Sequence, residues 1–440
     1  MPSKLAAPRG TQDFFPPQSG RWQELEARIH ALARRYGYGE IRTPIFESTD
    51  LFVRGVGETS DIVEKEMYTF TDKGGRSLTL RPEWTAPVVR ALLEHNLLSS
   101  GPQRLYYVGS FFRHERPQKG RYRQAHQFGV ECFGYGEPEA DVEVIHLAYE
   151  LLRAYRIPGI VLRLNSIGDE RDRPAYREAL LRHFEPHRDA LSEDSRRRLE
   201  RNPLRILDSK APEDRAFIAN APTFLDLLSA ESRAHFDAVR AGLDAIGIPH
   251  QVEPRLVRGF DYYTRTVFEF DSEFLGSQNA ICGGGRYDDL VRSLGGPPTP
   301  GVGFGLGLER FLMLLDEMGA SAAAEREGIA VVALGARARK LSLELLAALR
   351  RRDDAGVPII QDYGEAKLER QLKRADRANA RAAVILGDDE VAASVVVARD
   401  LVARTQSKLS VPLASAEVTA DEILRWYREL RPATAFPEAV

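Results

Sequence analysis

Residues Tyr106–Gly134 read YYVGSFFRHERPQKGRYRQAHQFGVECFG, two aromatic-rich runs on either side of a polar loop. The two runs alternate in character with a period of two, which predicts a long β-hairpin and with it an antiparallel sheet. On the returning strand Gln127, Gly129 and Glu131 share one face, because successive side chains of a strand point to opposite faces. That face presents an amide, a gap and a carboxylate.

The loop of this hairpin is strongly basic. Clustered guanidinium groups can bind phosphate, because their geometry matches the oxygens of that anion. A solvated, charged hairpin tip is the alternative, and for the loop alone it is the favoured one. Glu131 shifts the balance towards a binding site, because it points inward and a buried carboxylate needs a partner. The loop cations are Arg113, Arg116, Lys119, Arg121 and Arg123, opposed by Glu115.

Glycines alternate with apolar residues in Pro300–Leu315, PGVGFGLGLERFLMLL. This pattern predicts a strand with one apolar face and one bare face, on which a flat ring can lie against the backbone. Arg310 follows in the first turn of a helix, where a cation opposes the helix dipole, so an anionic ligand is expected beside it. A tightly packed strand–helix turn explains the pattern equally well. The glycines of the bare face are Gly301, Gly303, Gly305 and Gly307.

Two further stretches carry polar residues next to predicted elements. LVRGFDYYTRTVFEF (Leu256–Phe270) ends in a strand pattern, and Arg258 with the Tyr262–Tyr263 pair just before it could fix a small zwitterion or a phosphate. Later, Gly283–Gly285 predict a turn ahead of Arg286, and an ion pair of Arg286 with Asp288 or Asp289 is the default explanation for that second piece.

LTLRPEWTAPVVR (Leu78–Arg90) predicts a helix that begins after Pro82. Glu83 and Thr85 stand at its start, where acidic and hydroxyl side chains commonly cap the backbone N–H groups. Capping is therefore the default interpretation of both residues. The functional alternative is that Glu83 receives the ammonium group of a substrate.

The rest of the chain predicts three further parts. An amphipathic helix at Trp22–Tyr36 is followed by a strand at Glu40–Phe46, interrupted at Pro44. Charged helical patterns broken by prolines indicate a helical insertion at about 172–247. Beyond a boundary near residues 322–327, strands alternate with helices and predict a small α/β domain with a largely parallel sheet. Its strands are expected at Ile329–Leu334, Val357–Ile360 and Ala382–Leu386, and one of its helices, at Glu365–Asn379, is basic.

Composition excludes several classes of protein. The 440 residues carry 61 basic and 64 acidic side chains, so a globally basic nucleic-acid coat is excluded. Two cysteines, Cys132 and Cys282, are too few for a disulfide framework or a multi-cysteine zinc site and fit a reducing compartment. No Walker loop occurs, so any bound nucleotide is not held by a Walker-type phosphate loop. No H-E-x-x-H and no C-x-x-C motif occurs, so no protein-ligated zinc or other metal is expected. The apolar runs are too short to cross a bilayer and no signal peptide is evident, so we expect a cytoplasmic protein.

Taken in order, these stretches resemble the histidyl-tRNA synthetases, which are class II aminoacyl-tRNA synthetases. The resemblance covers nearly the whole chain. It is carried by RGTQDFFP (Arg9–Pro16), YGEIRTPIFE (Tyr38–Glu47), the arginine-bearing hairpin, NPLRILDSK (Asn202–Lys210), LVRGFDYY (Leu256–Tyr263), GGRYD (Gly284–Asp288) and the glycine-rich strand with Glu309 and Arg310.

The resemblance implies an α+β catalytic domain at residues 1–326, with a six- to seven-stranded antiparallel sheet, flanking helices and the helical insertion. It implies a C-terminal α/β anticodon-binding domain at residues 327–440, and a homodimer formed through Tyr38–Glu47. The implied reaction joins L-histidine and ATP into histidyl-adenylate and pyrophosphate, with Mg²⁺ on the phosphates. The histidyl group then passes to the 3′ end of the tRNA for histidine, releasing AMP.

The resemblance also implies residue roles. Arg113 and Arg310 match the arginines that hold the α- and γ-phosphates, and Arg258 matches one near the α-phosphate and the substrate carboxylate. The α-amino group of histidine is assigned to Glu83, Thr85 and Gln127, and the imidazole to Glu131, Tyr262, Tyr263 and nearby Tyr287. ATP is also assigned to Arg121, Gly305 and Gly307, and the tRNA acceptor end to Arg116 and Gln118.

Three departures from the family pattern affect local geometry: Asp289 replaces the usual glycine, Gly305 a common alanine and Ala125 a common aromatic residue. Two alternatives remain. One is the non-catalytic, synthetase-like regulatory subunit of ATP phosphoribosyltransferase, against which Arg258, Arg310 and the complete C-terminal domain argue. The other is a class II synthetase for another amino acid, against which Glu131 with Tyr262 and Tyr263 argues.

Overall fold

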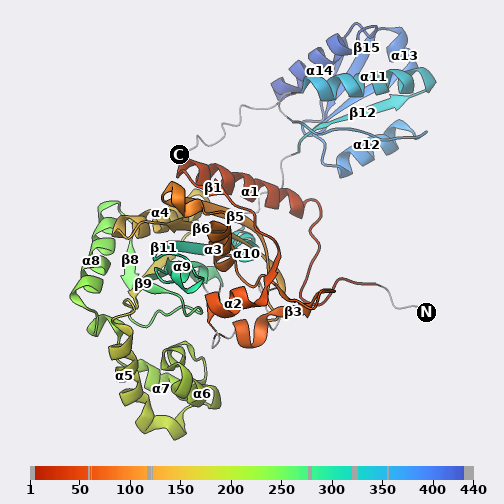
Figure 1. Ribbon diagram of the computed structural model, residues 1–440. Helices are drawn as coiled ribbons and strands as arrows, with labels where there is room; N and C mark the ends of the chain where they lie inside the picture. Colours follow the sequence, from red (N-terminus) through yellow and green to blue (C-terminus); the bar gives the residue numbers. More distant parts are fainter. Residues whose placement is uncertain are drawn as a thin grey trace. The chain divides into compact units, whose positions relative to one another are not determined.

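Figure 1 shows the computed structural model of the chain. The structure describes residues 5–57, 60, 62–115, 120, 122–275, 280–319, 326–353 and 356–430. The chain divides into two compact units, Met1–Ser321 and Ala322–Val440. Within the described residues, no helix has both the length and the apolar character needed to span a membrane.

An eight-stranded sheet forms the centre of the first unit, in the order β1-β5-β6-β11-β10-β9-β7-β8. The six inner strands are antiparallel throughout, whereas the short edge strands β1 and β8 pair in parallel with β5 and β7. The sheet is therefore larger than the predicted six to seven strands, and it is mixed at its edges. The strands are β1 Gly39–Glu40, β5 Gln103–Phe112, β6 Gln124–Phe133, β7 Ile160–Ser166, β8 His250–Val252, β9 Thr264–Ser272, β10 Ala280–Arg286 and β11 Gly301–Gly307.

The predicted hairpin is confirmed as β5 and β6, and the glycine-rich strand is confirmed as β11, which pairs with β6. The predicted turn at Gly283–Gly285 is wrong, because these glycines lie inside β10. Packing explains why they are glycines: a Cβ on Gly284 would lie 2.1 Å from the carbonyl oxygen of Gly303, and one on Gly285 would lie 2.4 Å from that of Thr266. A strand packed closely between two neighbouring strands requires residues without side chains, just as a tight turn does.

Helices cover one face of this sheet and enclose the main hydrophobic core. The expected N-terminal helix is α1, which buries Trp22, Leu25 and Ile29 against the apolar side of the strands. The opposite face carries a second cluster of aromatic residues, in which Trp84, Tyr107 and Tyr287 are buried. The helices around the sheet are α1 Gln18–Arg35, α3 Thr85–Glu94, α4 Pro138–Ala154, α8 Ala230–Ala245, α9 Leu290–Ser293 and α10 Leu308–Glu317.

A small three-stranded sheet, β2-β4-β3, lies beside helix α2 (Thr49–Val56). The interruption predicted at Pro44 is present, but it is longer than expected: only the two ends of Glu40–Phe46 belong to strands, β1 and β2, and residues 41–45 between them are irregular. Proline has no N–H to donate to a ladder, which explains the break. The strands are β2 Phe46–Ser48, β3 Tyr68–Thr71 and β4 Ser77–Leu80.

The helical insertion has a hydrophobic core of its own, built from residues such as Tyr176, Phe184 and Phe224. It contains α5 Arg173–Phe184, α6 Glu193–Arg201 and α7 Arg215–Ala219. Helix α8 falls inside the predicted range of 172–247 but packs against α4, and its Phe236 and Val239 belong to the main core. The separately packed part of the insertion therefore ends before α8, earlier than predicted.

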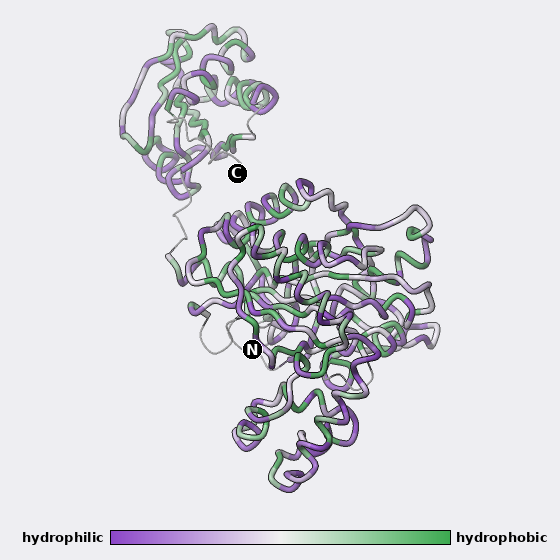
Figure 2. Tube along the Cα trace, turned by 90° about the vertical axis from the view of Figure 1, so that its left-hand side faces the viewer, coloured by the Kyte–Doolittle hydropathy of each residue, from purple (hydrophilic) through white to green (hydrophobic). Residues whose placement is uncertain are grey.

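The second unit is a five-stranded sheet in the order β13-β12-β14-β15-β16 with helices around it. Two strand pairs are parallel and two are antiparallel, so the sheet is mixed rather than largely parallel. Its hydrophobic stretches run through the middle of the unit in Figure 2. The elements are β12 Ile329–Leu334, α11 Ala336–Arg352, β13 Ile359–Gln361, α12 Leu368–Arg377, β14 Ala382–Gly387, α13 Asp388–Ala392, β15 Val395–Asp400, β16 Gln406–Ser410 and α14 Ala416–Leu430.

The three predicted strands of this unit correspond to β12, β13 and β14. The basic helix predicted at Glu365–Asn379 is present as the shorter α12. The prediction missed β15 and β16, which complete the sheet by antiparallel pairing.

Candidate functional site

A pocket of about 270 Å³ opens on the face of the sheet that lacks the large helices. Residues from the hairpin, from β9 and β10, and from the β11–α10 junction line it together. Arg113, Arg258 and Arg310, which are far apart in sequence, all reach this pocket, as do Gly305 and Gly307. The lining also includes three carboxylates, Glu115, Glu269 and Glu309, so the arginines offer N–H donors to an anionic ligand in a pocket that carries both charges.

Arg113 stands at the end of β5, where its Nε donates a hydrogen bond of 2.8 Å to the carbonyl oxygen of Pro82. Its guanidinium lies 5.1 Å from the ring centroid of Phe111 and 5.6 Å from that of Phe260. The carbonyl and the rings hold the cation in one place by a hydrogen bond and by cation–π attraction. Arg113 is thus fixed before any ligand arrives.

Arg310 is the third residue of α10, as the sequence predicts for an arginine in the first helical turn. The preceding Glu309 is buried, and its carboxylate accepts hydrogen bonds from the backbone N–H and the imidazole of His126 on β6. The start of α10 is therefore tied to the returning strand of the hairpin. This link keeps Arg310 on the same side of the pocket as the hairpin loop.

A second polar cluster centres on Glu131, which is 1% exposed. Its carboxylate accepts hydrogen bonds from the hydroxyl groups of Thr85 (2.8 Å), Tyr107 (3.1 Å) and Tyr287. Burial raises the pKa of Glu131 to about 8, although these hydrogen bonds lower it. The sequence correctly placed Glu131 inside the protein, and a buried acceptor of this kind suits a ligand with N–H groups.

Glu83 adopts the capping arrangement that was its default interpretation. Its carboxylate accepts hydrogen bonds from the backbone N–H groups of Thr85 (2.6 Å) and Ala86 (2.9 Å) at the start of α3. Burial raises the pKa of Glu83, and the capping hydrogen bonds and nearby Arg113 oppose that shift. The carboxylate of Glu83 also lies close enough to Glu131 to raise the pKa of Glu131.

Three tyrosines form the wall between the two polar clusters. The ring of Tyr287 lies edge-on to that of Tyr262, 5.6 Å away, and 6.4 Å from that of Tyr263. All three are buried, and the hydroxyl of Tyr263 interacts with the guanidinium of Arg258. A ligand could therefore contact the arginine pocket at one end and the Glu131 cluster at the other.

The glycine face of β11 is covered by side chains of the site over part of its length. A Cβ on Gly303 would lie 2.2 Å from the carboxylate of Glu131, and one on Gly305 would lie 1.9 Å from the amide nitrogen of Gln127. The bare face predicted for a flat ring is thus occupied at Gly303 by Glu131. Gly305 and Gly307 still line the pocket.

Three predicted site residues, Arg116, Gln118 and Arg121, lie outside the described residues. The sequence analysis missed Tyr107, which stands opposite Gly129 in the hairpin and reaches Glu131. The strand register of the hairpin could have identified it. It also missed Glu269, whose only signal is its alternation on β9.

Arg286 forms the predicted ion pair with Asp288 (3.2 Å), whereas Asp289 pairs with Arg292 (2.8 Å). The fully buried guanidinium of Arg286 also pairs with Asp141 on α4, 145 residues away. No local pattern predicts that contact. It holds the residue next to Tyr287 in place, since an unpaired charge would be costly there.

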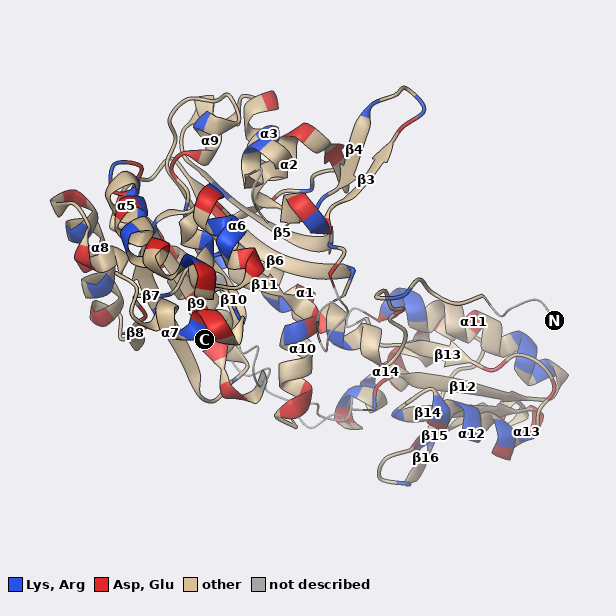
Figure 3. Cartoon of the chain, turned by 90° about the horizontal axis from the view of Figure 1, so that it is seen from below, with Lys and Arg blue, Asp and Glu red and all other residues tan. Residues whose placement is uncertain are grey.

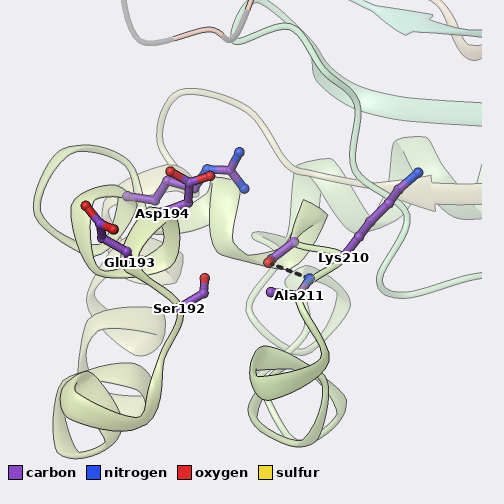
Figure 4. Close-up of a pocket in the computed structure, with 7 residues that line it drawn as sticks. Ser192, Glu193, Asp194, Lys210 and Ala211 are labelled. Atoms are coloured by element: carbon purple, nitrogen blue, oxygen red, sulfur yellow. Dashed lines mark hydrogen bonds between the residues drawn. The ribbon is translucent and has the colours of Figure 1, made fainter. Parts of the chain in front are cut away.

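Within the described residues, no group of three or more His, Cys, Asp or Glu side chains is arranged to hold a metal ion. A larger pocket, about 460 Å³, lies in the helical insertion (Figure 4). Figure 4 shows Lys210 extending away from the acidic pair Glu193 and Asp194. Its lining mixes both charges and includes none of the predicted site residues.

Comparison with known proteins agrees with the sequence resemblance. The family model described as histidyl-tRNA synthetase matches residues 10–311, and the model described as anticodon binding domain matches residues 329–421. A histidine–tRNA ligase of Streptococcus equi subsp. zooepidemicus (strain H70) is 48% identical over 412 residues, which are 92% of this chain and 96% of that protein. One from Geobacillus sp. (strain WCH70) is 49% identical over 414 residues, which are 93% of this chain and 96% of that protein.

The crystal structure of apo histidyl-tRNA synthetase from S. aureus superposes with a TM-score of 0.80 at 36% identity. The match covers 96% of this chain and 100% of that chain. The similarity to histidyl-tRNA synthetases therefore extends over both units of the chain. The chain belongs to the histidyl-tRNA synthetase family.

Proposed function

We propose that the arginine pocket binds ATP and that the adjoining tyrosine–carboxylate cluster binds histidine, so that the histidine carboxylate meets the α-phosphorus between them. The reaction is the activation of histidine by ATP, which releases pyrophosphate, and the transfer of histidine to the 3′ end of its tRNA, which releases AMP. One observation carries the proposal: Tyr263 contacts Arg258 of the pocket and packs against Tyr287, which donates a hydrogen bond to Glu131. The two subsites are contiguous.

In this proposal Arg113 holds the α-phosphate, Arg310 the γ-phosphate, and Arg258 the α-phosphate and the histidine carboxylate. Displacement at phosphorus needs little covalent chemistry from protein, so fixed cations that stabilise the developing charge are the main contribution expected of the site. Gly305 and Gly307 allow the nucleotide to approach the backbone of β11. Arg121 completes the ATP site, and Arg116 and Gln118 face the tRNA acceptor end.

The histidine substrate makes two sets of contacts. Thr85, Gln127 and Glu83 receive its α-amino group, with the carboxylate of Glu83 as the counter-ion. The imidazole N–H is bound by Glu131, and its ring lies among Tyr262, Tyr263 and Tyr287. A site with buried polar groups on both sides rejects amino acids that leave those groups unpaired, often by about 10⁴-fold or more.

Mg²⁺ accompanies the ATP in this proposal and neutralises charge on its phosphate oxygens. Such an ion binds oxygen ligands and commonly shares them between phosphates and one or two carboxylates. Glu115, which lines the pocket 3.9 Å from Arg113, offers a carboxylate of that kind.

We assign residues 1–326 to catalysis and residues 327–440 to anticodon binding. Helix α12 carries a basic face, seen as blue bands in Figure 3, which can bind tRNA phosphates without reading their sequence. Ile45, Phe46 and Phe70 are each close to half exposed, and such an apolar cluster beside Tyr38–Glu47 supports a homodimer through that segment. The chain acts in the cytoplasm, where its two buried, free cysteines remain reduced. The basic side chains of this helix region are Lys367, Arg370, Lys373, Arg374 and Arg377.

The test is amino-acid-dependent ATP–pyrophosphate exchange with a panel of amino acids, using the full chain and its Arg258→Ala variant. We expect exchange with histidine, and a loss in the variant of about 100-fold or more in kcat with a much smaller change in the KM for histidine. Exchange with another amino acid would contradict the substrate. No exchange with any amino acid would instead favour a regulatory, non-catalytic protein.

A further inference from the structure

We propose that Glu269 is a positioning residue for Arg258, and that it lies at the pocket end of a network of charged side chains that extends across β9 and β7. The inference rests on the proposed role of Arg258 in histidine activation. Glu269 lies in the lining of the same pocket, yet neither the sequence patterns nor the family match assigned it a role. Its geometry is the reason to assign one.

The guanidinium of Arg258 packs at a defined position on the sheet. Its guanidinium rests on the backbone of Gly283, where a Cβ would lie only 2.4 Å away, so a residue with a side chain would displace it. Gly283 pairs directly with Glu269 in the β9–β10 ladder, which places both on one face of the sheet. The carboxylate of Glu269 accepts a hydrogen bond from the guanidinium. Strand β10 thus leaves space for the guanidinium at Gly283, and strand β9 supplies the carboxylate of Glu269 that binds it.

The chain of charges continues away from the pocket. Asp271, two residues after Glu269, lies on the same face of β9 and interacts with its carboxylate. Arg163 on β7 pairs with Asp271 at 2.5 Å and reaches Glu253 at 3.5 Å. Charged side chains therefore run from the pocket to the loop that begins at Glu253, with the carboxylates of Glu269 and Asp271 next to each other and an arginine on either side of this pair.

The same loop is also fixed by its backbone. The side-chain amide of Asn165, which is fully buried, donates hydrogen bonds to the carbonyl oxygens of Pro254 (3.1 Å) and Leu256 (2.9 Å). These contacts hold the segment just before Arg258 against β7. The backbone is thus positioned by Asn165, and the end of the side chain is positioned by Glu269.

Arg258 needs such an anchor for two reasons. Its long side chain has many rotamers, and ordering it only when substrate binds would add to the activation barrier. Arg113 and Arg310 line the same pocket, and a carboxylate beside Arg258 offsets the like charge of three arginines gathered around one cavity. Because a guanidinium has five N–H donors, binding to Glu269 still allows it to bind a phosphate or carboxylate oxygen.

The experiment is a double-mutant cycle on the full chain, measured by histidine-dependent ATP–pyrophosphate exchange. We expect Glu269→Ala to lower kcat about 10- to 100-fold, with the KM for histidine changed by less than about threefold. Glu269→Gln keeps an oxygen acceptor and should recover part of that loss. The decisive result is that Arg258→Ala with Glu269→Ala is no slower than Arg258→Ala alone, within about twofold, because Glu269 acts only through Arg258.

Glu231→Ala is the matched control. Glu231 on α8 pairs with Arg265 on the same strand at 2.7 Å, and neither residue lines the pocket, so we expect less than about a twofold change in kcat. If the losses from Arg258→Ala and Glu269→Ala multiply, or if Glu269→Ala matches the unsubstituted protein, the inference is wrong. If Arg258→Ala itself has no effect, the proposed function of Arg258 fails, whatever Glu269 does.

Discussion

Glu131 illustrates how burial sets the chemistry of a single residue. It is almost fully removed from solvent, and three hydroxyl groups donate hydrogen bonds to it. Burial raises its pKa from 4.5 to about 8 despite those donors. Between these two pH values the folded protein binds a proton at Glu131 that the unfolded chain does not bind. The stability that this proton contributes is present below pH 4.5 and is lost as the pH rises through about 8.

The Glu131→Gln variant should show this loss directly. Gln carries no titrating group, so the variant should gain stability relative to the unsubstituted protein between about pH 5 and pH 8, by a few kcal/mol at most. Urea unfolding at both pH values measures the difference. The same variant should raise the KM for histidine about tenfold or more, because the neutral amide oxygen of Gln is a weaker acceptor for the imidazole N–H than a carboxylate. A stability difference that is equal at both pH values would contradict the raised pKa.

At the scale of the element, the glycines of strand β11 leave room for side chains of the site to pack on its surface. The Cβ of Gly303→Ala would meet the carboxylate of Glu131 and the carbonyl oxygen of Val130, neither of which can move easily. We expect this variant to lose about 1–3 kcal/mol of unfolding free energy and to bind histidine more weakly, because overpacking displaces Glu131. Equilibrium unfolding and the KM for histidine are the measurements.

Gly305→Ala is the matched control on the same face of β11. The three atoms nearest to its Cβ all belong to the end of the Gln127 side chain, which can rotate away. Its cost should stay below about 1 kcal/mol, because a mobile amide relieves the clash. If both variants lost the same unfolding free energy, the difference between a fixed neighbour (Glu131) and a mobile one (Gln127) would not determine the cost of the added Cβ.

At the scale of the whole molecule, the two units have separate hydrophobic cores. A chain ending at residue 326 keeps every described residue of the pocket and of the Glu131 cluster. It should retain histidine-dependent pyrophosphate exchange within about tenfold, while kcat/KM for tRNA charging falls about 100-fold or more, because the tRNA phosphate contacts proposed for the second unit would be lost. Measuring both reactions on one preparation provides the control. Equal losses in both would show that the second unit supports the catalytic unit rather than tRNA binding.

Local patterns were sufficient to predict elements and the direction of their faces. Alternation predicted the hairpin, the glycine-rich strand and the inward position of Glu131, and all three are present. Local patterns failed where a residue type has two uses: the glycines at 283–285 indicated a turn but relieve crowding inside a strand. They also failed for α8, whose helical pattern does not say which core it packs into.

The sequence by itself determined the family, the order of most elements and several of the residues around the pocket, because these depend on motifs and on periodicities of two and 3.6 residues. Only the tertiary structure decided which distant residues meet. The pairing of Arg286 with Asp141, the pairing of Arg258 with Glu269 and the position of β11 between β6 and β10 are examples. The energy of such contacts depends on burial and on the loss of solvent around both partners, and no local stretch of sequence carries that information.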